Sequence, residues 1–242
     1  PMIGFGQQTY VPDDNFEAYL EANGMGNGIA NDNYVTTANI DTITNLNIQN
    51  QSLSDLTGIE DFLALTYLNC SNNPLNENNW NQFTSFDVSN NLALTNLICS
   101  YNFLTSIDLS QNTSLTEFVC DENNLTTLDV SQNTALIYLE CYESQLTSLD
   151  LSQNTALISL GCSYNQLTSL DVSQNLALTF LNCSGNQLTN LDVRNGNNTN
   201  ITLFTSIDNP NLNCIDVDNP TWSTNNWTSI PSWSNFSNNC AT

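Results

Sequence analysis

Leucines recur along most of this chain at regular distances, with small polar residues between them. One stretch, residues 157–177, reads LISLGCSYNQLTSLDVSQNLA. Apolar and polar residues alternate around Cys162 and again around Val172, and a period of two is typical of β-strands with one buried face. The pattern therefore predicts two short strands in this stretch, with Cys162 and Val172 pointing inward.

This stretch is one copy of a unit that repeats every 21 residues. Three columns with that spacing are Cys99, Cys120, Cys141, Cys162 and Cys183; Asp87, Asp108, Asp129, Asp150, Asp171 and Asp192; and Asn91, Asn112, Asn133, Asn154 and Asn175. Each larger apolar side chain contributes roughly 1.5–3 kcal/mol when buried, whereas ordering the backbone costs about 1–2 kcal/mol for every residue. One unit alone would not fold, so the repeat predicts a solenoid of stacked coils.

The unit can be written LxxLxCxxNxLTxLDVSxNxA. It resembles the bacterial leucine-rich-repeat family, and in particular its 21-residue nested (IRREKO-type) subclass, over residues 43–193. The resemblance implies a leucine-rich-repeat solenoid, β-rich, with parallel strands stacked in a curved right-handed coil. We expect about seven coils over residues 43–200. In the family, the strands that contain LxxLxC line the concave face, which is the usual binding surface.

Both ends of the chain depart from the repeat, as a solenoid requires if its core is to be covered. Residues 9–42 contain PDDNFEAYLEANG, which predicts a short helix with Asp13 or Asp14 as its N-cap and Gly24 at its end. This cap, with the stretch that follows it, resembles the N-terminal cap of internalin-like surface proteins. The tryptophan-rich residues 201–242 resemble the C-terminal cap of secreted leucine-rich-repeat proteins. Residues 1–8 are interpreted as the remnant of a signal peptide or a tag, and the resemblance implies a secreted or outer-surface protein.

The eight cysteines fall into two groups. Six of them, Cys70 and the five of the regular column, stand where the family otherwise has leucine, so we expect buried free thiols. Disulfides between successive rungs, or a metal site along the row, are the less favoured alternatives because the rungs form a straight line. Cys214 and Cys240 lie outside the column, and we predict a disulfide between them.

The charge excludes several functions. Asp and Glu number 24 against one basic residue, Arg194, and histidine is absent. The chain is therefore unsuited to nucleic acid, to anionic membranes, to serine-type triads and to histidine-based zinc sites. No apolar run is long enough for membrane insertion. The aspartate column brings carboxylates about 5 Å apart, which should raise some of their pKa values unless turn hydroxyls and N–H groups satisfy them. Ca²⁺ bridging is the alternative, and otherwise no cofactor is expected.

The two halves of the unit differ in how much their outward positions vary. These positions hardly change in the LTxLDVSxN half but change in every coil around the LxxLxC strand, and variable positions on a rigid scaffold suit recognition. The predicted ligand-binding residues are Tyr101, Glu117, Asp121, Glu122, Tyr138, Glu140, Tyr142, Glu143, Tyr164 and Phe180. Aromatic rings beside carboxylates suit a sugar or a basic protein segment. The coil that begins at Leu136 departs most from the repeat, because Ser144 replaces its asparagine.

We interpret the chain as an exported, adhesin-like binding protein without enzymatic activity, which recognises a protein or glycan through this face. A spacer or stalk without a ligand is the main alternative. A glycoside hydrolase with a pair of carboxylates is a weaker one, since an open sheet has no cleft that excludes water. Ice binding through the regular threonine column is another, and self-association through the tyrosine-rich face is a further hypothesis.

Overall fold

The chain folds into an elongated stack of parallel coils. The structure is a computed structural model that describes residues 6–71 and 83–240. Its largest sheet has eight parallel strands in the order β12-β10-β8-β7-β6-β5-β4-β3, and the sequence led us to expect about seven coils. The strands of this sheet are β3 (Asn45–Asn47), β4 (Tyr67–Asn69), β5 (Asn96–Ile98), β6 (Glu117–Val119), β7 (Tyr138–Glu140), β8 (Ser159–Gly161), β10 (Phe180–Asn182) and β12 (Leu203–Thr205).

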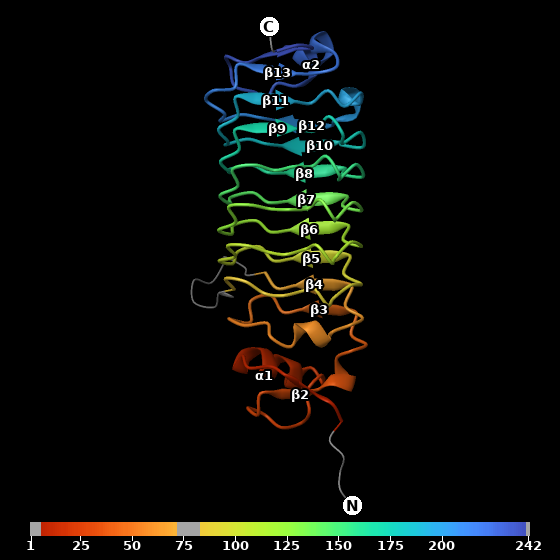
Figure 1. The fold of residues 1–242 in the computed structure, drawn as a ribbon. Coiled ribbons are helices and arrows are strands. Elements are labelled where there is room, and N and C mark those ends of the chain that lie inside the picture. Colours follow the sequence, from red (N-terminus) through yellow and green to blue (C-terminus); the bar gives the residue numbers. More distant parts are fainter. Residues whose placement is uncertain (1–5, 72–82, 241–242) are drawn as a thin grey trace, which may run out of the picture.

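Every strand of this sheet is in register with its neighbours. Glu117 pairs with Tyr138, and Tyr138 pairs with Ser159, so residues 21 apart in sequence are adjacent in space. The middle residue of each strand faces the core, as Leu139 does at 0% exposure. The parallel solenoid inferred from the repeat is therefore confirmed (Figure 1).

The second half of the unit forms strands only toward the C-terminal end. These strands make a four-stranded sheet and are β9 (Ser169–Asp171), β11 (Asn190–Asp192), β13 (Cys214–Asp216) and β14 (Asn235–Ser237). Within the described ranges, short 3₁₀ helices cover Thr37–Asn39, Ile59–Asp61 and Asn198–Asn200. The expectation of two strands per coil thus holds for the later coils. In earlier coils the corresponding segment still buries its leucines, for example Leu128 and Leu149, without forming a strand.

The N-terminal cap is a helix against a two-stranded sheet. Strands β1 (Gln8–Tyr10) and β2 (Tyr34–Thr36) pair antiparallel, and α1 spans Asp14–Ala22. Asp13 is its N-cap, accepting hydrogen bonds from the backbone N–H groups of Asn15 and Phe16 at 3.0 Å. Its second carboxylate oxygen accepts from Ser54 N at 2.8 Å, which fixes the helix to the first coils. Residues 1–5 of the interpreted signal-peptide remnant lie outside the described residues.

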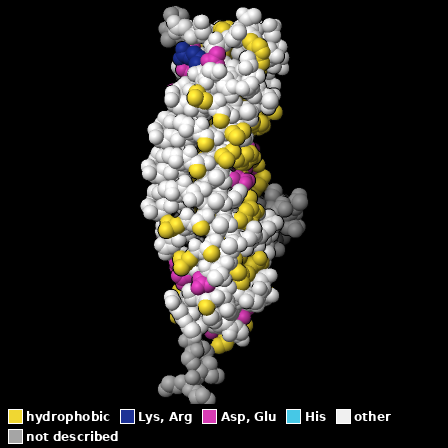
Figure 2. All heavy atoms as spheres, turned by 90° about the vertical axis from the view of Figure 1, so that its right-hand side faces the viewer, with side chains coloured by type: hydrophobic (Ala, Val, Ile, Leu, Met, Phe, Trp, Pro, Cys, Tyr) yellow, Lys and Arg dark blue, Asp and Glu magenta, His cyan; other side chains and the backbone are white. Residues whose placement is uncertain are grey.

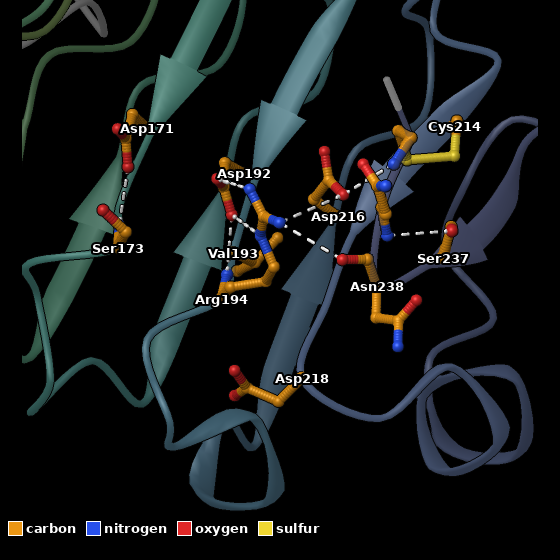
Figure 3. Close-up of polar contacts among 12 residues, drawn as sticks. Asp171, Ser173, Asp192, Val193, Arg194, Cys214, Asp216, Asp218, Ser237 and Asn238 are labelled. Atoms are coloured by element: carbon orange, nitrogen blue, oxygen red, sulfur yellow. Dashed lines mark hydrogen bonds and ion pairs between the residues drawn. A yellow bond between two sulfur atoms is a disulfide. The ribbon is translucent and has the colours of Figure 1, made fainter. Parts of the chain in front are cut away.

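The C-terminal cap closes the other end with aromatic side chains and a covalent bond. Helix α2 (Pro220–Asn226) packs beside β14, and the Phe204 and Trp227 rings stack with centroids 4.3 Å apart. Cys214 and Cys240 form the predicted disulfide. Arg194 donates to Asp192 Oδ1 at 2.9 Å and to Asn238 O at 3.2 Å, so the chain's one basic side chain ties β11 to the segment after β14 (Figure 3).

The cysteine column lies in the core. All six cysteines of the row have 0% exposure, and Cys99, Cys120, Cys141, Cys162 and Cys183 are free thiols, as predicted. Burial raises the pKa of Cys183 to about 12. A thiol that does not ionise is a poor nucleophile, so the column acts as small hydrophobic side chains.

The aspartate column serves the turns. Asp129 Oδ1 accepts from Ser131 N, and Asp150 Oδ1 from Ser152 N, each at 2.9 Å. These backbone hydrogen bonds lower the pKa of both carboxyls. The expectation that turn N–H groups and hydroxyls satisfy these carboxylates is therefore met at both residues, and the rise in pKa expected in their absence does not occur. The local N–H groups stabilise the ionised form more than the neighbouring carboxylates destabilise it.

Two ladders of buried asparagines hold successive coils together. In the first ladder, Asn154 Nδ2 donates to Val130 O at 2.9 Å and to Asn133 O at 3.0 Å, both in the preceding coil. In the second, Asn165 Nδ2 donates to Cys141 O, and its Oδ1 accepts from Leu146 N. Each asparagine thereby satisfies backbone groups that the turns leave without a partner inside the stack.

We expect Asn154→Ala to lower the free energy of unfolding by about 2 kcal/mol, because two buried hydrogen bonds are lost and a small cavity remains. The exposed neighbour provides the control, since Gln153→Ala should change the free energy by less than about 0.5 kcal/mol. Urea unfolding followed by circular dichroism measures both. Equal stabilities of the two variants would contradict a structural role for the ladder.

Candidate functional site

The outer face of the eight-stranded sheet carries the first and third residue of each strand. On β7 these are Tyr138, which is 37% exposed, and Glu140, which is partly buried. Glu117 on β6 and Phe180 on β10 occupy the equivalent first position and are partly exposed. All four were predicted ligand-binding residues, and the alternation of the strands places them on one face.

A second column follows the strands and has left-handed backbone geometry. Its φ angles are 58° at Tyr101, 50° at Glu122, 49° at Glu143 and 53° at Tyr164. Such angles cost roughly 1–2 kcal/mol for residues other than glycine, with asparagine and aspartate least affected. Coils nearer the ends place Asn50, Gly185 and Asp208 at this turn position, which accept the geometry easily. Among the residues that the structure describes, only the middle coils combine the strained backbone with long side chains.

Tyrosine and carboxylate groups of the middle coils form a hydrogen-bonded chain. The hydroxyls of Tyr101 and Tyr142 are 2.9 Å apart, and Tyr142 Oη donates to Glu122 Oε1 at 3.1 Å. These residues come from three successive coils, because Glu122 follows Tyr101 by 21 residues and Tyr142 follows Glu122 by 20. Burial is the largest cause of a raised pKa at Tyr142, and the hydrogen bond with the Tyr101 hydroxyl raises this pKa further. The phenol therefore stays protonated and able to donate.

The carboxyls of Asp121 and Glu140, beside these hydrogen-bonded tyrosines, are shielded from water to different extents. Asp121 is 7% exposed, and its Oδ1 accepts from Tyr142 N at 2.9 Å. Burial raises the pKa of Asp121 to about 7, and the nearby Glu140 and Glu122 carboxylates add to the rise. Burial also raises the pKa of Glu140, against a hydrogen bond with the Tyr138 side chain that lowers it. At Gly161 an added Cβ would lie 1.7 Å from Glu140 Oε2, so this glycine makes room for the carboxylate.

The remaining predicted residues lie at the C-terminal side of this group. Tyr164 is 53% exposed, and its ring covers Gly185, where an added Cβ would be 2.6 Å from Tyr164 Cδ1. Phe180 is separated from Tyr138 by the rung of Ser159. The structure thus brings eight of the predicted residues together in adjacent coils, and Tyr164 and Phe180 extend the surface. We call the eight the sheet-face cluster: Tyr101, Glu117, Asp121, Glu122, Tyr138, Glu140, Tyr142 and Glu143.

Two exposed isoleucines beside the cluster were missed at the level of sequence. Thr116 Oγ1 donates to Thr95 O at 3.1 Å, and Thr179 Oγ1 donates to Ile158 O at 3.3 Å, as members of a threonine ladder that precedes the strands. Ile137 and Ile158 replace threonine in the two coils between them, and each is 42% exposed. The sequence could have revealed them, because they interrupt a column of residues that is threonine in the coils on either side.

The second asparagine ladder also breaks next to the cluster. Position 144, where the pattern places asparagine, is Ser144, which is 8% exposed. Its Oγ has no hydrogen-bond partner among the residues that the structure describes. In neighbouring coils the asparagine Oδ1 accepts from a leucine N–H of the preceding coil, as Asn123 does from Leu104. Serine is too short to do the same for Leu125, so this coil lacks part of the ladder.

The described residues show neither a metal-binding group nor a membrane-spanning helix. No set of three or more Cys, Asp and Glu side chains in residues 6–71 and 83–240 is placed to hold a metal ion. Within the same ranges, no helix has the length and apolar character needed to cross a bilayer. The chemistry of the cluster is that of hydroxyl donors, carboxylates and aromatic rings on an open surface.

These features define a leucine-rich-repeat-like solenoid with a variable, acidic and aromatic sheet face. No family model matches the chain, and no curated protein matches it. Among solved structures it is similar to the internalin InlF from Listeria monocytogenes, with 23% identity, a TM-score of 0.59, and 94% of this chain and 71% of that chain covered. A leucine-rich-repeat protein from Leptospira interrogans is 17% identical, with a TM-score of 0.53, over 84% of this chain and 69% of that one.

A third similar structure is the functional domain of InlJ from Listeria monocytogenes, which is described as including a cysteine ladder. It is 28% identical with a TM-score of 0.49, and the match covers 98% of this chain. The chain spans 63% of the length of that domain. At these levels of identity, the InlF and Leptospira similarities show the fold, which is that of leucine-rich-repeat proteins, and do not show a ligand.

Ser144→Asn should raise the free energy of unfolding by about 1 kcal/mol, because the new amide can complete the ladder and accept from Leu125. Ser148→Asn, at an exposed position of the same coil, is the matched control and should have little effect. Thermal and urea unfolding compare the two variants. A destabilised Ser144→Asn protein would show that the site has no room for the amide.

Asp121 should make stability fall as pH rises. Its folded pKa of about 7 lies above the ordinary value of 3.8 for an aspartate, so the folded state binds more protons between these values. The stabilising protonated form is fully present below about pH 4 and is lost as pH approaches about 7. Asp121→Asn should therefore be more stable than the wild type at pH 8, by about 1–2 kcal/mol, and similar to it at pH 4. Urea unfolding at both pH values tests this, and a constant difference between the two proteins would contradict it.

Proposed function

We propose that this protein is a non-enzymatic recognition module that binds a partner protein through the sheet-face cluster, in a secreted or cell-surface setting. The observation that carries the proposal is the coincidence of three features in the middle coils. Long side chains occupy strained left-handed positions there, the asparagine ladder is interrupted at Ser144, and tyrosines and carboxylates are exposed together. Strain of this kind persists where side chains serve a purpose other than stability.

The composition of the cluster supports recognition of a protein. Tyrosine supplies a large apolar ring with a hydroxyl donor and is enriched in protein interfaces. The Tyr101–Tyr142–Glu122 chain holds its side chains in place before binding, which reduces the entropy lost on association. A spacer would need none of this, since residues like those at Asn50 and Gly185 fold the same turn with less strain.

The disulfide and the burial of Asp121 support the secreted or cell-surface setting and the non-enzymatic role. Cys214 and Cys240 are bonded, and disulfides persist mainly in oxidising compartments such as the outside of the cell. Asp121, a carboxyl of the cluster that a glycoside hydrolase would need exposed, is buried and accepts a hydrogen bond from the Tyr142 N–H. This supports a binding role over glycoside hydrolysis. A glycan is the second candidate ligand, because Tyr138 and Tyr164 expose ring surface on which a sugar could stack.

The triple variant Tyr138→Ala, Tyr142→Ala, Glu143→Ala should abolish binding to a ligand found by screening the protein against protein and glycan arrays. These residues share one coil at the centre of the cluster, and central aromatic residues dominate interface energies. We expect a loss in affinity of at least about a hundredfold.

The control is a triple variant on the other half of the coil. Thr126→Ala, Thr147→Ala, Thr168→Ala changes three exposed residues of successive coils, and it should bind like the wild type. Circular dichroism and thermal unfolding confirm that both variants are folded. Full binding by the first variant would refute the assignment of the site, and a hit restricted to the glycan array would replace a protein ligand by a carbohydrate.

A further inference from the structure

The broken threonine ladder marks an apolar surface next to the sheet-face cluster. Ile137 and Ile158 are neighbours in adjacent coils, because Ile158 N donates to Ile137 O at 2.9 Å. Each precedes a strand of the sheet, and Tyr138, the residue after Ile137, is also exposed. Figure 2 shows hydrophobic side chains gathered at mid-height along one edge of the viewed face, with an acidic side chain among them.

Isoleucine at these two positions costs the solenoid a hydrogen bond between a threonine hydroxyl and a backbone carbonyl of the preceding coil. Threonines in the flanking coils are less apolar, and their hydroxyls donate to the preceding coil, as Thr116 does at 3.1 Å and Thr179 at 3.3 Å. Isoleucine cannot make this bond, and it leaves apolar surface in water. Because the backbone stays in register through both coils, a threonine would fit there equally well. Packing within the solenoid therefore does not explain the isoleucines.

The charges around this surface are all negative. Glu117 lies on the rung before Tyr138, and Glu140 follows it on the same strand. Asn96 Nδ2 donates to Glu117 Oε2, and the Glu140 carboxylate is directed over Gly161. No basic side chain compensates these carboxylates, because Arg194 is the chain's only one and is paired with Asp192 near the C-terminal end.

These charges select among the occupants of the surface. A second copy of the chain would bring a formal charge of −23 and no available cation, so it would be repelled. A glycan would be expected to meet aromatic and hydrogen-bonding groups, whereas Ile137 and Ile158 offer neither. A basic protein segment matches both the apolar and the acidic character of the surface. One of its apolar side chains can cover the isoleucines, while its ammonium or guanidinium groups reach the carboxylates and the Tyr138 ring.

We propose that Ile137, Tyr138 and Ile158, with Glu117 and Glu140 beside them, form a docking surface for a partner segment in which basic residues flank an apolar one. This inference rests on the proposed function and specifies the chemistry of the partner. It predicts association that weakens with salt, through the carboxylates, and that also depends on apolar contact with the isoleucines.

The test uses a phage-displayed library of random peptides selected on the immobilised wild-type protein, with the double variant Ile137→Thr, Ile158→Thr as the counter-selection. The double variant restores the threonine column, so it should fold at least as well as the wild type. We expect enriched peptides in which lysine or arginine flanks leucine, isoleucine or phenylalanine. Fluorescence anisotropy of a labelled, enriched peptide should show affinity about tenfold lower for the double variant and lower at high ionic strength.

Leu176→Thr is the matched control. Leu176 is 60% exposed, and the equivalent residues of preceding coils are Thr113, Thr134 and Thr155, so the substitution removes the same kind of side chain at a different place. It should leave peptide affinity unchanged. Enrichment of acidic or purely polar peptides, no enrichment, or equal affinity for the wild type and the double variant would each overturn the proposal. A wild-type dimer in light scattering that the double variant abolishes would also overturn it, in favour of self-association.

Failure of this inference can be distinguished from failure of the proposed function. If the ligand from the array screen is lost by the Tyr138, Tyr142 and Glu143 triple variant but retained by the isoleucine double variant, the recognition site stands and the apolar docking surface does not. If both variants retain that ligand, neither proposal stands.

Discussion

Satisfying backbone groups inside the stack is the constraint on which this solenoid depends. Each coil turns sharply after its strand, and the turns leave carbonyl and N–H groups that the sheets cannot pair. Buried asparagines such as Asn154 and Asn165 bond these groups across successive coils. The ladders require that successive coils stay in register, which the strict 21-residue spacing provides in the regular coils. Longer coils keep the same register, since Asn91 Nδ2 donates to Ile59 O, 32 residues away. Leucine and cysteine packing then follows from that register.

Departures from this constraint are concentrated in a few adjacent coils. Ser144 interrupts the second asparagine ladder, and Ile137 and Ile158 interrupt the threonine ladder that precedes the strands. Glu122 and Glu143 have strained, left-handed backbone angles. A repeat protein tolerates such local losses because each coil is stabilised by its neighbours on both sides. Sites where local rules fail without compensation are where function is expected, and here they adjoin the exposed tyrosines and carboxylates.

Electrostatics divides the molecule in a similar way. Aspartates of the regular column, such as Asp129, are exposed and stabilised by turn N–H groups, which lowers their pKa. Asp121 is buried among other acids, and its pKa is raised to about 7. Arg194 lies at the C-terminal end, where it joins Asp192 to the cap (Figure 3). The cluster is therefore left with uncompensated negative charge beside apolar surface.

The sequence by itself determined the solenoid, its register and the buried cysteine column, because a strict period allows only one way to stack the apolar positions. The helical cap from Asp14 and the Cys214–Cys240 disulfide followed instead from local signals outside the period, a helix-capping pattern and a pair of cysteines off the column. It also placed Tyr138 and Glu140 on the outer face, through strand alternation. Only the tertiary structure decided that Asp121 is buried, that Tyr101 reaches Tyr142 two coils away, and that Glu140 occupies the space above Gly161. These depend on side-chain directions and on the size of residues in neighbouring coils, which a repeat pattern does not encode.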